Sequence, residues 1–395
     1  MIYIYHITLC FIMNHDYITR TIIKTCLIYE PWAHGEAHLE FNKAFLQTLS
    51  YLYDKIIFLG DKNHIQYLNK IKYKTEILLY PCNITDYHTL KGKVLSVFRE
   101  VLNIKKIKKM SQGADIYFSY GAAHSMLIAE RFLKNKKVFY IQHGQIETIT
   151  RKQHIYNINY YLPMALNNLP ANHYIIVLGD FIKKNLESAI PKLIGKIIAI
   201  DHPFIKTNIV INKTGFNKIK IGTIGVGTKD KGIEQLNEIS LFIKKNNLDI
   251  QVNHIGRIFD DVILDKKMIC CPFSSNKLIP RNDFINKIAE LDYILFLYPQ
   301  NSYKFTASGA IFDAFLLGKP IIALQNDYFN YLFEKAGSVG FLLDNIESLK
   351  QKLLELPNPN TDFYKEMSKL SCKALEVFSP EKIAEELRPY LGGVC

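Results

Sequence analysis

The sequence predicts an α/β protein with two doubly wound parallel sheets, each in a domain of its own. The chain has 395 residues, more than a single hydrophobic core usually holds. Short runs rich in Ile, Val, Tyr and Phe alternate with helical patterns, and most are continuously apolar, as strands buried on both faces are. A polar linker, 206–217, divides this series in two. We therefore expect two Rossmann-like domains that face each other across a cleft.

The first series predicts a seven-stranded N-terminal domain over residues 24–205. Its apolar runs have strand length, and stretches with helical spacing lie between them. The expected strands are 24–29, 55–59, 75–80, 115–120, 137–142, 173–178 and 196–200, with helices at 37–51, 92–110 and 125–133. Residues 1–23 form an N-terminal extension, whose apolar run is far shorter than the roughly 20 residues that span a bilayer.

The second series predicts a six-stranded C-terminal domain over residues 218–378. The expected strands are 218–224, 250–255, 267–271, 293–298, 320–324 and 339–342, with helices at 231–245, 282–291, 309–317 and 346–356. Ser379-Pro380 then opens a last helix within 379–395, because proline suits the first turn of a helix.

The charge and the cysteine count limit the class of protein. The net charge of +12 predicts an anionic partner: nucleic acid, a phosphorylated small molecule or an acidic membrane face. The seven cysteines are odd in number and contain no CxxC pair, so neither a disulfide framework nor a zinc site is indicated. A reducing compartment is the simplest interpretation.

The segment from Asn282 to Leu324 carries the first candidate site. A helix, a strand and a polar loop lead to Ser308-Gly309, where a second helix begins. Ser308 suits the N-cap, and Gly309 allows a ligand to approach the backbone N–H groups that favour phosphate. Asp313 lies one turn into that helix and could accept hydrogen bonds from a ribose. The alternative is a plain helix cap and a solvated charge.

A glycine-rich turn follows the first strand of the second domain. Gly225 and Gly227 would let the backbone reach a phosphate, and Lys229 and Lys231 would add positive charge. The rival interpretation is a dinucleotide fingerprint GxGxxG, but Asp230 stands where the last glycine is needed.

Two loops of the first domain contain histidines at expected strand ends. His143 follows the strand at 137–142 and precedes a glycine. The loop after the first strand contains His34, Gly35, Glu36 and His38, together with the only tryptophan of the chain. At the carboxyl edge of a parallel sheet these side chains would face the cleft, although a lone loop histidine is more often a surface residue.

These motifs together resemble the GT-B glycosyltransferases, especially the family 4-like enzymes of bacterial surface-polysaccharide synthesis. In 313–323 the acidic residue, the apolar run, Gly-x-Pro and the following strand match, with Asp313 where the family has its ribose-binding glutamate. Lys231-Gly232 matches the family's Lys-Gly. The chain departs from the pattern at Phe305, where a glutamate is usual, and at Val226, where an arginine is usual.

The resemblance implies a fold, a reaction and roles for several residues. It implies the GT-B fold, with a nucleotide-diphosphate sugar in the C-terminal domain and the acceptor in the N-terminal domain. His143 would be the catalytic residue that reaches the donor sugar. The donor would be bound by Gly225, Gly227, Lys229, Lys231, Ser308, Gly309 and Asp313. The loop with His34, Gly35, Glu36 and His38 would line the cleft or hold the acceptor, and the last helix would cross back to the first domain.

No metal and no cofactor beyond the donor sugar are expected. The sequence has no DxD after an apolar strand and no His/Cys ligand spacing, so lysines and helix N-termini would neutralise the leaving group. Between Lys91 and Lys109 stand seven cations and one acid. This region predicts either a solvated face or a surface that binds the anionic membrane. Nucleic acid is not expected as a partner, because no nucleic-acid-binding motif accompanies the charge.

The expected function is hexosyl transfer from a nucleotide-diphosphate sugar to a glycan or lipid-linked glycan, for O-antigen, capsule or another surface polysaccharide. The expected location is cytoplasmic, peripheral on the inner face of the membrane. Two alternatives stay open. One is a nucleotide-sugar 2-epimerase of the same shape, and the other is a non-catalytic protein that binds nucleotide sugars or anionic surfaces.

Overall fold

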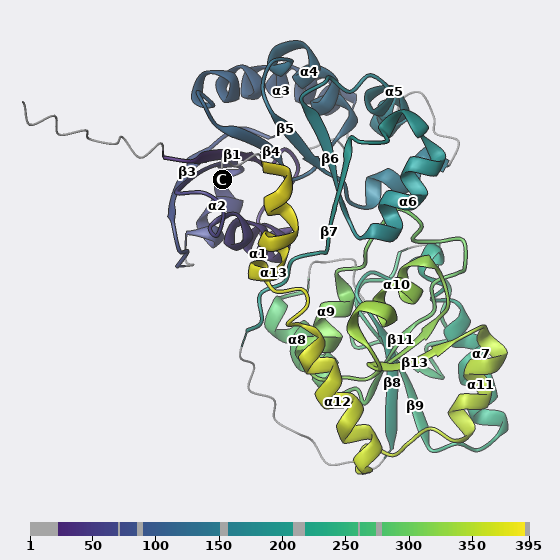
Figure 1. The fold of residues 1–395 in the computed structure, drawn as a ribbon. Helices are drawn as coiled ribbons and strands as arrows, with labels where there is room; N and C mark the ends of the chain where they lie inside the picture. The colour runs from purple at the N-terminus through teal and green to yellow at the C-terminus, as the bar shows by residue number, and fades with distance from the viewer. Residues whose placement is uncertain are drawn as a thin grey trace, which may run out of the picture.

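The chain folds into two α/β domains stacked end to end (Figure 1). The computed structural model describes residues 23–69, 72–84, 90–150, 157–207, 218–259, 261–273 and 279–391. The first sheet has the strand order β3-β2-β1-β4-β5-β6-β7 and the second the order β10-β9-β8-β11-β12-β13, and all their described pairings are parallel. The expected architecture of two doubly wound parallel sheets is confirmed.

The N-terminal domain contains seven strands and six α-helices among the described residues. The strands are β1 (Thr25–Tyr29), β2 (Lys55–Gly60), β3 (Glu76–Pro81), β4 (Asp115–Phe118), β5 (Val138–Ile141), β6 (His173–Leu178) and β7 (Ile197–Ile200). The helices are α1 (Leu39–Leu49), α2 (Lys62–Leu68), α3 (Leu90–Met110), α4 (Ala123–Leu133), α5 (Leu162–Asn167) and α6 (Asp180–Ala189). A 3₁₀ segment, η1 (Gly144–Thr150), follows β5.

The C-terminal domain repeats this plan with six strands. They are β8 (Ile219–Ile224), β9 (Ile250–Ile255), β10 (Ile269–Cys270), β11 (Tyr293–Phe296), β12 (Ile321–Leu324) and β13 (Gly340–Leu343). The helices are α7 (Gln235–Lys245), α8 (Arg281–Ala289), α9 (Ala310–Leu316), α10 (Asp327–Ala336), α11 (Ile346–Leu354) and α12 (Asp362–Ala374). A short 3₁₀ turn, η4 (Lys229–Lys231), follows β8, and α13 (Pro380–Leu387) closes the chain.

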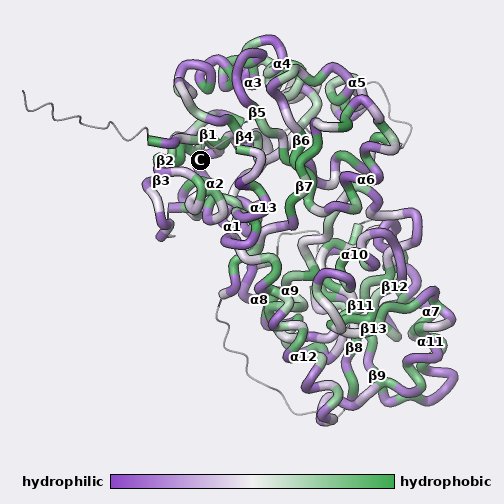
Figure 2. The backbone as a smooth tube through the Cα atoms, viewed as in Figure 1, coloured by the Kyte–Doolittle hydropathy of each residue, from purple (hydrophilic) through white to green (hydrophobic). Residues whose placement is uncertain are grey.

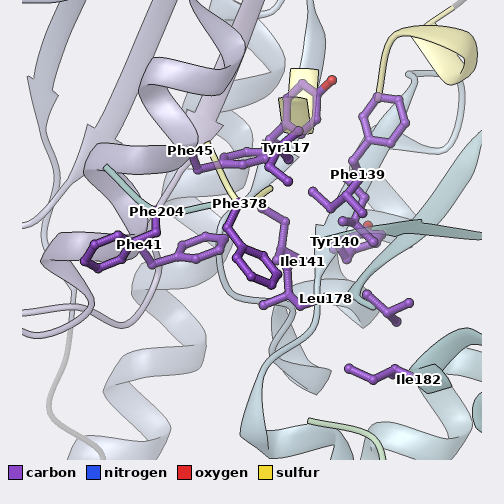
Figure 3. Packing of buried hydrophobic residues seen from close by; sticks show 14 of the residues in the cluster. Phe41, Phe45, Tyr117, Phe139, Tyr140, Ile141, Leu178, Ile182, Phe204 and Phe378 are labelled. Carbon is purple, nitrogen blue, oxygen red and sulfur yellow. The ribbon is translucent and has the colours of Figure 1, made fainter. Parts of the chain in front are cut away.

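Hydrophobic strands form the centre of both domains (Figure 2). In the first domain the rings of Phe45, Tyr117 and Phe139 pack in series, with centroids 5.7 and 4.7 Å apart (Figure 3). Phe312 of α9 packs on Phe204, which follows β7, with centroids 5.0 Å apart. The two domains therefore share apolar contacts next to their connection.

The last helix returns to the first domain. α13 packs against α1 and β7, and Figure 1 shows it beside α1. The Glu386 carboxylate of this helix accepts a hydrogen bond from the Asp201 N–H at 2.7 Å. The chain thus crosses between the domains twice, which ties the two walls of the cleft together.

Some predicted segments lie outside the described residues. These are nearly all of the extension 1–23 and most of the linker 206–217. The helices α2, α5, α6, α10 and α12 were not predicted. Of these, α2, α6 and α10 follow a strand in the usual order of βαβ units, whereas α5 and α12 follow other helical segments.

Candidate functional site

A cavity of about 400 Å³ lies between the two domains. The N-terminal domain contributes the end of the loop after β1 and the start of α1, and the chain after β7 contributes His202 and Phe204. The C-terminal domain contributes the turns after β8 and β9 and the starts of α8 and α9. Ligands of open α/β sheets bind beyond the carboxyl ends of the strands, so this cavity is the candidate site.

Glu30, directly after β1, is the central polar group of the N-terminal wall. Its carboxylate is fully buried and accepts five hydrogen bonds of 2.7 to 3.1 Å. The donors are the N–H groups of Trp32 and Ala33, His38 Nδ1, Asn42 Nδ2 and Ser119 Oγ. Burial alone would raise the pKa of Glu30, but the hydrogen bonds from His38, Asn42 and Ser119 outweigh it and hold the pKa well below its usual range. Glu30 is therefore an ionised carboxylate inside the protein.

His38 connects this buried charge to the cavity. Its Nδ1 lies 3.1 Å from Glu30 Oε2, and because an ionised carboxylate only accepts, Nδ1 donates and Nε2 keeps its lone pair in the neutral ring. His38 lines the cavity and has a φ of +60°, a left-handed conformation that a histidine adopts at a cost. The Glu30 contact holds the ring in one orientation despite that strain.

His143 lies behind His38 in the same wall. The two rings meet edge to face, with centroids 4.2 Å apart, and His143 Nε2 donates to the Ser119 carbonyl at 2.9 Å. The described residues that line the cavity do not include His143. Burial, and then the neighbouring His38 and His202, hold the pKa of His143 well below its usual range, so the ring is neutral.

The other predicted residues of the first loop divide between cavity and support. Glu36 is exposed and lines the cavity. His34 and Gly35 are not among the described lining residues: His34 Nδ1 lies 3.5 Å from Asp61, and the Gly35 carbonyl accepts a hydrogen bond from His64 Nδ1 at 2.8 Å. These two contacts fix the loop against the start of α2.

Closely packed glycines shape the C-terminal wall. Gly225 has a φ of +85° and lines the cavity together with Val226 and Gly256. A Cβ on Gly256 would lie 1.6 Å from the Gly225 carbonyl oxygen, so the turns after β8 and β9 can approach only without side chains there. Gly227 is buried, is not among the described lining residues and packs on Ile233 and His254, which gives it a structural position.

The predicted lysines differ in position. Lys231 Nζ lies 3.8 Å from where a Gly225 Cβ would be and 5.9 Å from the centre of the Tyr298 ring, and it makes no ion pair with any described residue. Lys229 is exposed on η4, and neither lysine is among the described lining residues of the cavity. Lys231 can therefore reach a phosphate bound at the Gly225 turn more readily than Lys229.

Asp313 lines the cavity, but it already has a partner. Arg281 Nη2 donates to Asp313 Oδ1 at 2.5 Å. Burial raises the pKa of Asp313 above its usual range, although the Arg281 hydrogen bond and charge oppose this effect. Only one carboxylate oxygen is occupied by the ion pair, which leaves the other for a ligand.

The expected N-cap at Ser308 is wrong. The cap position of α9 is Gly309, with no side-chain cap, and Gly309 lines the cavity. Ser308 is buried, and its hydroxyl shares a 2.9 Å hydrogen bond with the Tyr298 hydroxyl. The buried tyrosine competes for the serine hydroxyl, which the local sequence alone does not reveal.

Two arginines of the cavity were missed by the sequence analysis. Arg281 begins α8, and Arg257 follows β9. The Arg257 guanidinium makes no ion pair within the described part of the chain, and the Arg257 carbonyl accepts the Gly227 N–H at 2.7 Å. Arg257 thus lies beside the turn where Val226 replaces the expected arginine, and only the pairing of β8 with β9 brings the two together.

Phe305, the second departure from the family pattern, also contacts a charged residue from a distant part of the chain. The buried Phe305, where a glutamate was expected, donates its N–H to Glu147 Oε1 at 2.8 Å. Glu147 belongs to η1 of the opposite domain. Searched over the described residues, the chain shows no group of three or more His, Cys, Asp or Glu side chains that could hold a metal ion.

Comparisons with known proteins identify this architecture. No protein-family model and no curated protein matches the sequence. HepE from Anabaena, solved with UDP and glucose, superposes with a TM-score of 0.59 at 12% identity, over 94% of this chain and 100% of its own. TarM gives a TM-score of 0.62 at 13% identity over 94% and 99%. The chain has the GT-B fold.

A third solved structure agrees with this assignment. Sucrose-phosphate synthase from Thermosynechococcus elongatus superposes with a TM-score of 0.60 at 12% identity, over 93% of this chain and 98% of its own. At these identities the likeness establishes the GT-B fold and its two-domain arrangement. The site residues must be argued from the geometry of this chain.

Proposed function

We propose that this protein is a glycosyltransferase that moves a sugar from a nucleoside-diphosphate donor, UDP-linked, to a hydroxyl group of a glycan. One observation carries the proposal: a single cavity joins the buried Glu30–His38 pair of one domain to the cation-bearing glycine turns of the other. Such an arrangement supplies what transfer needs, a proton acceptor on one side and stabilisation of a leaving diphosphate on the other. UDP is chosen because HepE was solved with UDP and with UDP-glucose.

The C-terminal wall is suited to the diphosphate. Arg257 and Arg281 line the cavity, Lys231 lies beside the Gly225 turn, and Gly309 leaves backbone open at the start of α9. Guanidinium groups bind phosphate oxygens in pairs of hydrogen bonds, and they stabilise the charge that the diphosphate gains when its bond to the sugar breaks. The free oxygen of Asp313 would accept from the ribose.

The N-terminal wall is suited to the acceptor. His38 lines the cavity and keeps the lone pair of Nε2, and Glu30 would stabilise the imidazolium formed when His38 takes the proton of the acceptor hydroxyl. The acceptor oxygen then bonds to the sugar carbon, and the diphosphate leaves with the electron pair of the broken bond. His143 packs against the His38 ring. From the family resemblance, we propose that His143 is the catalytic residue that reaches the donor sugar.

The test is calorimetry on the full chain followed by product analysis. UDP should bind more tightly than uridine, and Arg257→Ala should reduce this preference, whereas Arg388→Ala on the exposed last turn should not. A UDP-sugar should yield a glycosylated acceptor. An isomerised donor formed without acceptor would instead indicate a 2-epimerase, and equal binding of UDP and uridine would contradict the diphosphate site.

We further propose that the acceptor is lipid-linked and belongs to surface-polysaccharide synthesis on the inner face of the cytoplasmic membrane. The support is the outward face of α3, on the side of the N-terminal domain away from the C-terminal domain (Figure 1). Its first half exposes Val94, Phe98 and Leu102, spaced one helical turn apart, together with Leu95 and Val97. Its second half exposes four lysines, Lys105, Lys106, Lys108 and Lys109. The side chains of Lys91 and Lys93 lie outside the described set.

This face of α3 combines exposed apolar side chains with positive charge, the two features by which a protein surface binds an anionic membrane. Each lysine near an anionic surface contributes about 1 kcal/mol, and exposed apolar side chains can enter the headgroup boundary. Among the described residues, no helix combines the length and apolar character needed to cross a bilayer. The protein should co-sediment with vesicles containing phosphatidylglycerol more than with neutral ones. Phe98→Ser should weaken this binding, and Phe363→Ser, which is similarly exposed on the other domain, should not.

A further inference from the structure

The only tryptophan of the chain is exposed next to the candidate site. Trp32 lies in the loop after β1, and 43% of its surface is exposed. Its ring stacks on Tyr120, with centroids 5.4 Å apart and planes 18° apart. Its edge meets the ring of His38, whose centroid is 5.9 Å away. An indole left half exposed here keeps apolar ring surface that a ligand could cover.

The ring is held rigidly, and by the same group that orients His38. Glu30 Oε1 accepts the N–H groups of Trp32 and Ala33 at 2.9 and 3.1 Å, while Oε2 accepts from His38. Pro31 restricts the backbone immediately before Trp32. The position of the indole is therefore fixed relative to the cavity-lining imidazole.

Tyr120 packs against one face of the Trp32 indole. Tyr120 is itself stacked parallel to His143, with centroids 5.9 Å apart and planes 6° apart. Trp32, Tyr120 and His143 thus form a series of nearly parallel rings along the edge of the N-terminal sheet. One face of the indole packs on Tyr120, and the exposure of the residue leaves ring surface for a ligand.

We propose that the Trp32–Tyr120 pair is the subsite that binds a neutral sugar ring of the acceptor glycan. A pyranose has an apolar face of C–H groups that packs on an aromatic ring, and equatorial hydroxyls that need hydrogen-bond partners. The same loop offers such partners in the exposed Glu36 and in His34. This inference rests on the proposed function, because it places the acceptor next to His38, but its test does not need transfer activity.

The single tryptophan makes the test specific. The intrinsic fluorescence of the full chain is followed while maltose, cellobiose, lactose and chitobiose are added, with sorbitol as a polyol control. At least one disaccharide should change the emission of Trp32 in a saturable way, and sorbitol should not. Tyr120→Ala should weaken the apparent sugar affinity about three- to tenfold, as expected for loss of an aromatic contact. Tyr160→Ala, exposed on the same domain, should leave it unchanged.

A second measurement is needed for variants of Trp32, because they lack the fluorophore and could also be less stable. In saturation-transfer NMR, the signals of the bound sugar should be partly retained with Trp32→Phe and lost with Trp32→Ala. Melting temperatures of all variants report folding. If UDP binds and no disaccharide perturbs Trp32, the subsite is refuted while the proposed function stands. If a disaccharide binds and UDP does not, the subsite stands and the proposed function fails.

Discussion

The N-terminal wall of the cleft has its polar groups bound to one another, whereas two cations of the C-terminal wall make no ion pair among the described residues. Glu30 alone collects five donors, and His38 has one nitrogen committed to it. Across the cavity, Arg257 and Lys231 make no ion pair within the described residues. The difference suggests that the first wall is organised before any ligand binds, while the second is completed by an anion.

The largest effect should come from breaking the C-terminal wall itself. In Gly256→Ala the new Cβ would lie 1.6 Å from the Gly225 carbonyl oxygen, so both turns must move. We expect a loss of about 3 kcal/mol in unfolding free energy and loss of UDP binding. Gly144→Ala, where nothing lies within 4 Å, is the control. Equal melting temperatures of the two variants would show that the turns are not locked together.

The next largest effect should come from Glu30→Gln. The amide is nearly the same size but cannot hold a charged His38, so kcat should fall about 10²-fold or more. UDP affinity, measured by calorimetry, should be unchanged because Glu30 belongs to the other wall. Glu100→Gln is the matched control. Glu100, on α3, is also buried, but it accepts a hydrogen bond from the Tyr29 hydroxyl at 2.5 Å. Similar losses of kcat in both variants would contradict a specific role for Glu30.

The same two carboxylates should give opposite pH dependence of stability. The folded-state pKa of Glu30 is depressed, so its contribution is present above about pH 4.3, the usual pKa of glutamate, and is lost as the pH falls. Burial raises the pKa of Glu100 to about 7, so Glu100 destabilises the fold increasingly as the pH rises from about 4.3 through 7. Glu100→Gln should therefore raise the melting temperature at pH 8 but not at pH 4.5, and Glu30→Gln should lower it most at neutral pH. The melting temperatures, taken from pH 4 to 8, decide this.

A smaller effect is expected for the ion pair of the C-terminal wall. Asp313→Ala removes the partner that positions Arg281 and the expected ribose acceptor. A charge-assisted hydrogen bond contributes about 1.5 to 3 kcal/mol, so UDP affinity should fall about tenfold or more. Arg281→Ala should reduce UDP affinity more than uridine affinity, and Asp313→Ala should reduce both. If neither variant changes either affinity, the donor lies elsewhere.

The smallest effect should follow metal removal. The leaving diphosphate can be neutralised without a metal ion, by the positive charges of Arg257, Arg281 and Lys231. Transfer in excess EDTA should therefore proceed at the untreated rate. Activity lost in EDTA and restored by Mn²⁺ or Mg²⁺ would mean that the cations of this wall do not suffice.

Most of the fold could be predicted from the sequence, because buried parallel strands are continuous apolar runs. All the expected strands are present, with ends shifted by at most two residues, as for 115–120 against β4 at Asp115–Phe118. Glycine turns such as Gly225 were also recognisable, because they follow a strand directly. These features depend on residues that are close together in the chain.

The site was less predictable because its contacts join distant residues. Arg281 pairs with Asp313 across 32 positions, and Glu30 accepts a hydrogen bond from Ser119 across 89. His143 satisfied the rule of a histidine after a strand, yet His38, which packs against it, is the histidine of this pair that lines the cavity. The one signal that could have pointed to Glu30 is its position directly after the first buried strand.

If the two walls have separate tasks, UDP calorimetry on His38→Ala and Arg257→Ala should give different results. We expect His38→Ala to bind UDP with the affinity of the wild type, although it no longer supports transfer. Arg257→Ala should bind UDP about tenfold more weakly or worse, with uridine affinity unchanged. If His38→Ala loses UDP affinity as strongly as Arg257→Ala, or if Arg257→Ala loses none, the division of the cleft into a donor wall and an acceptor wall is wrong.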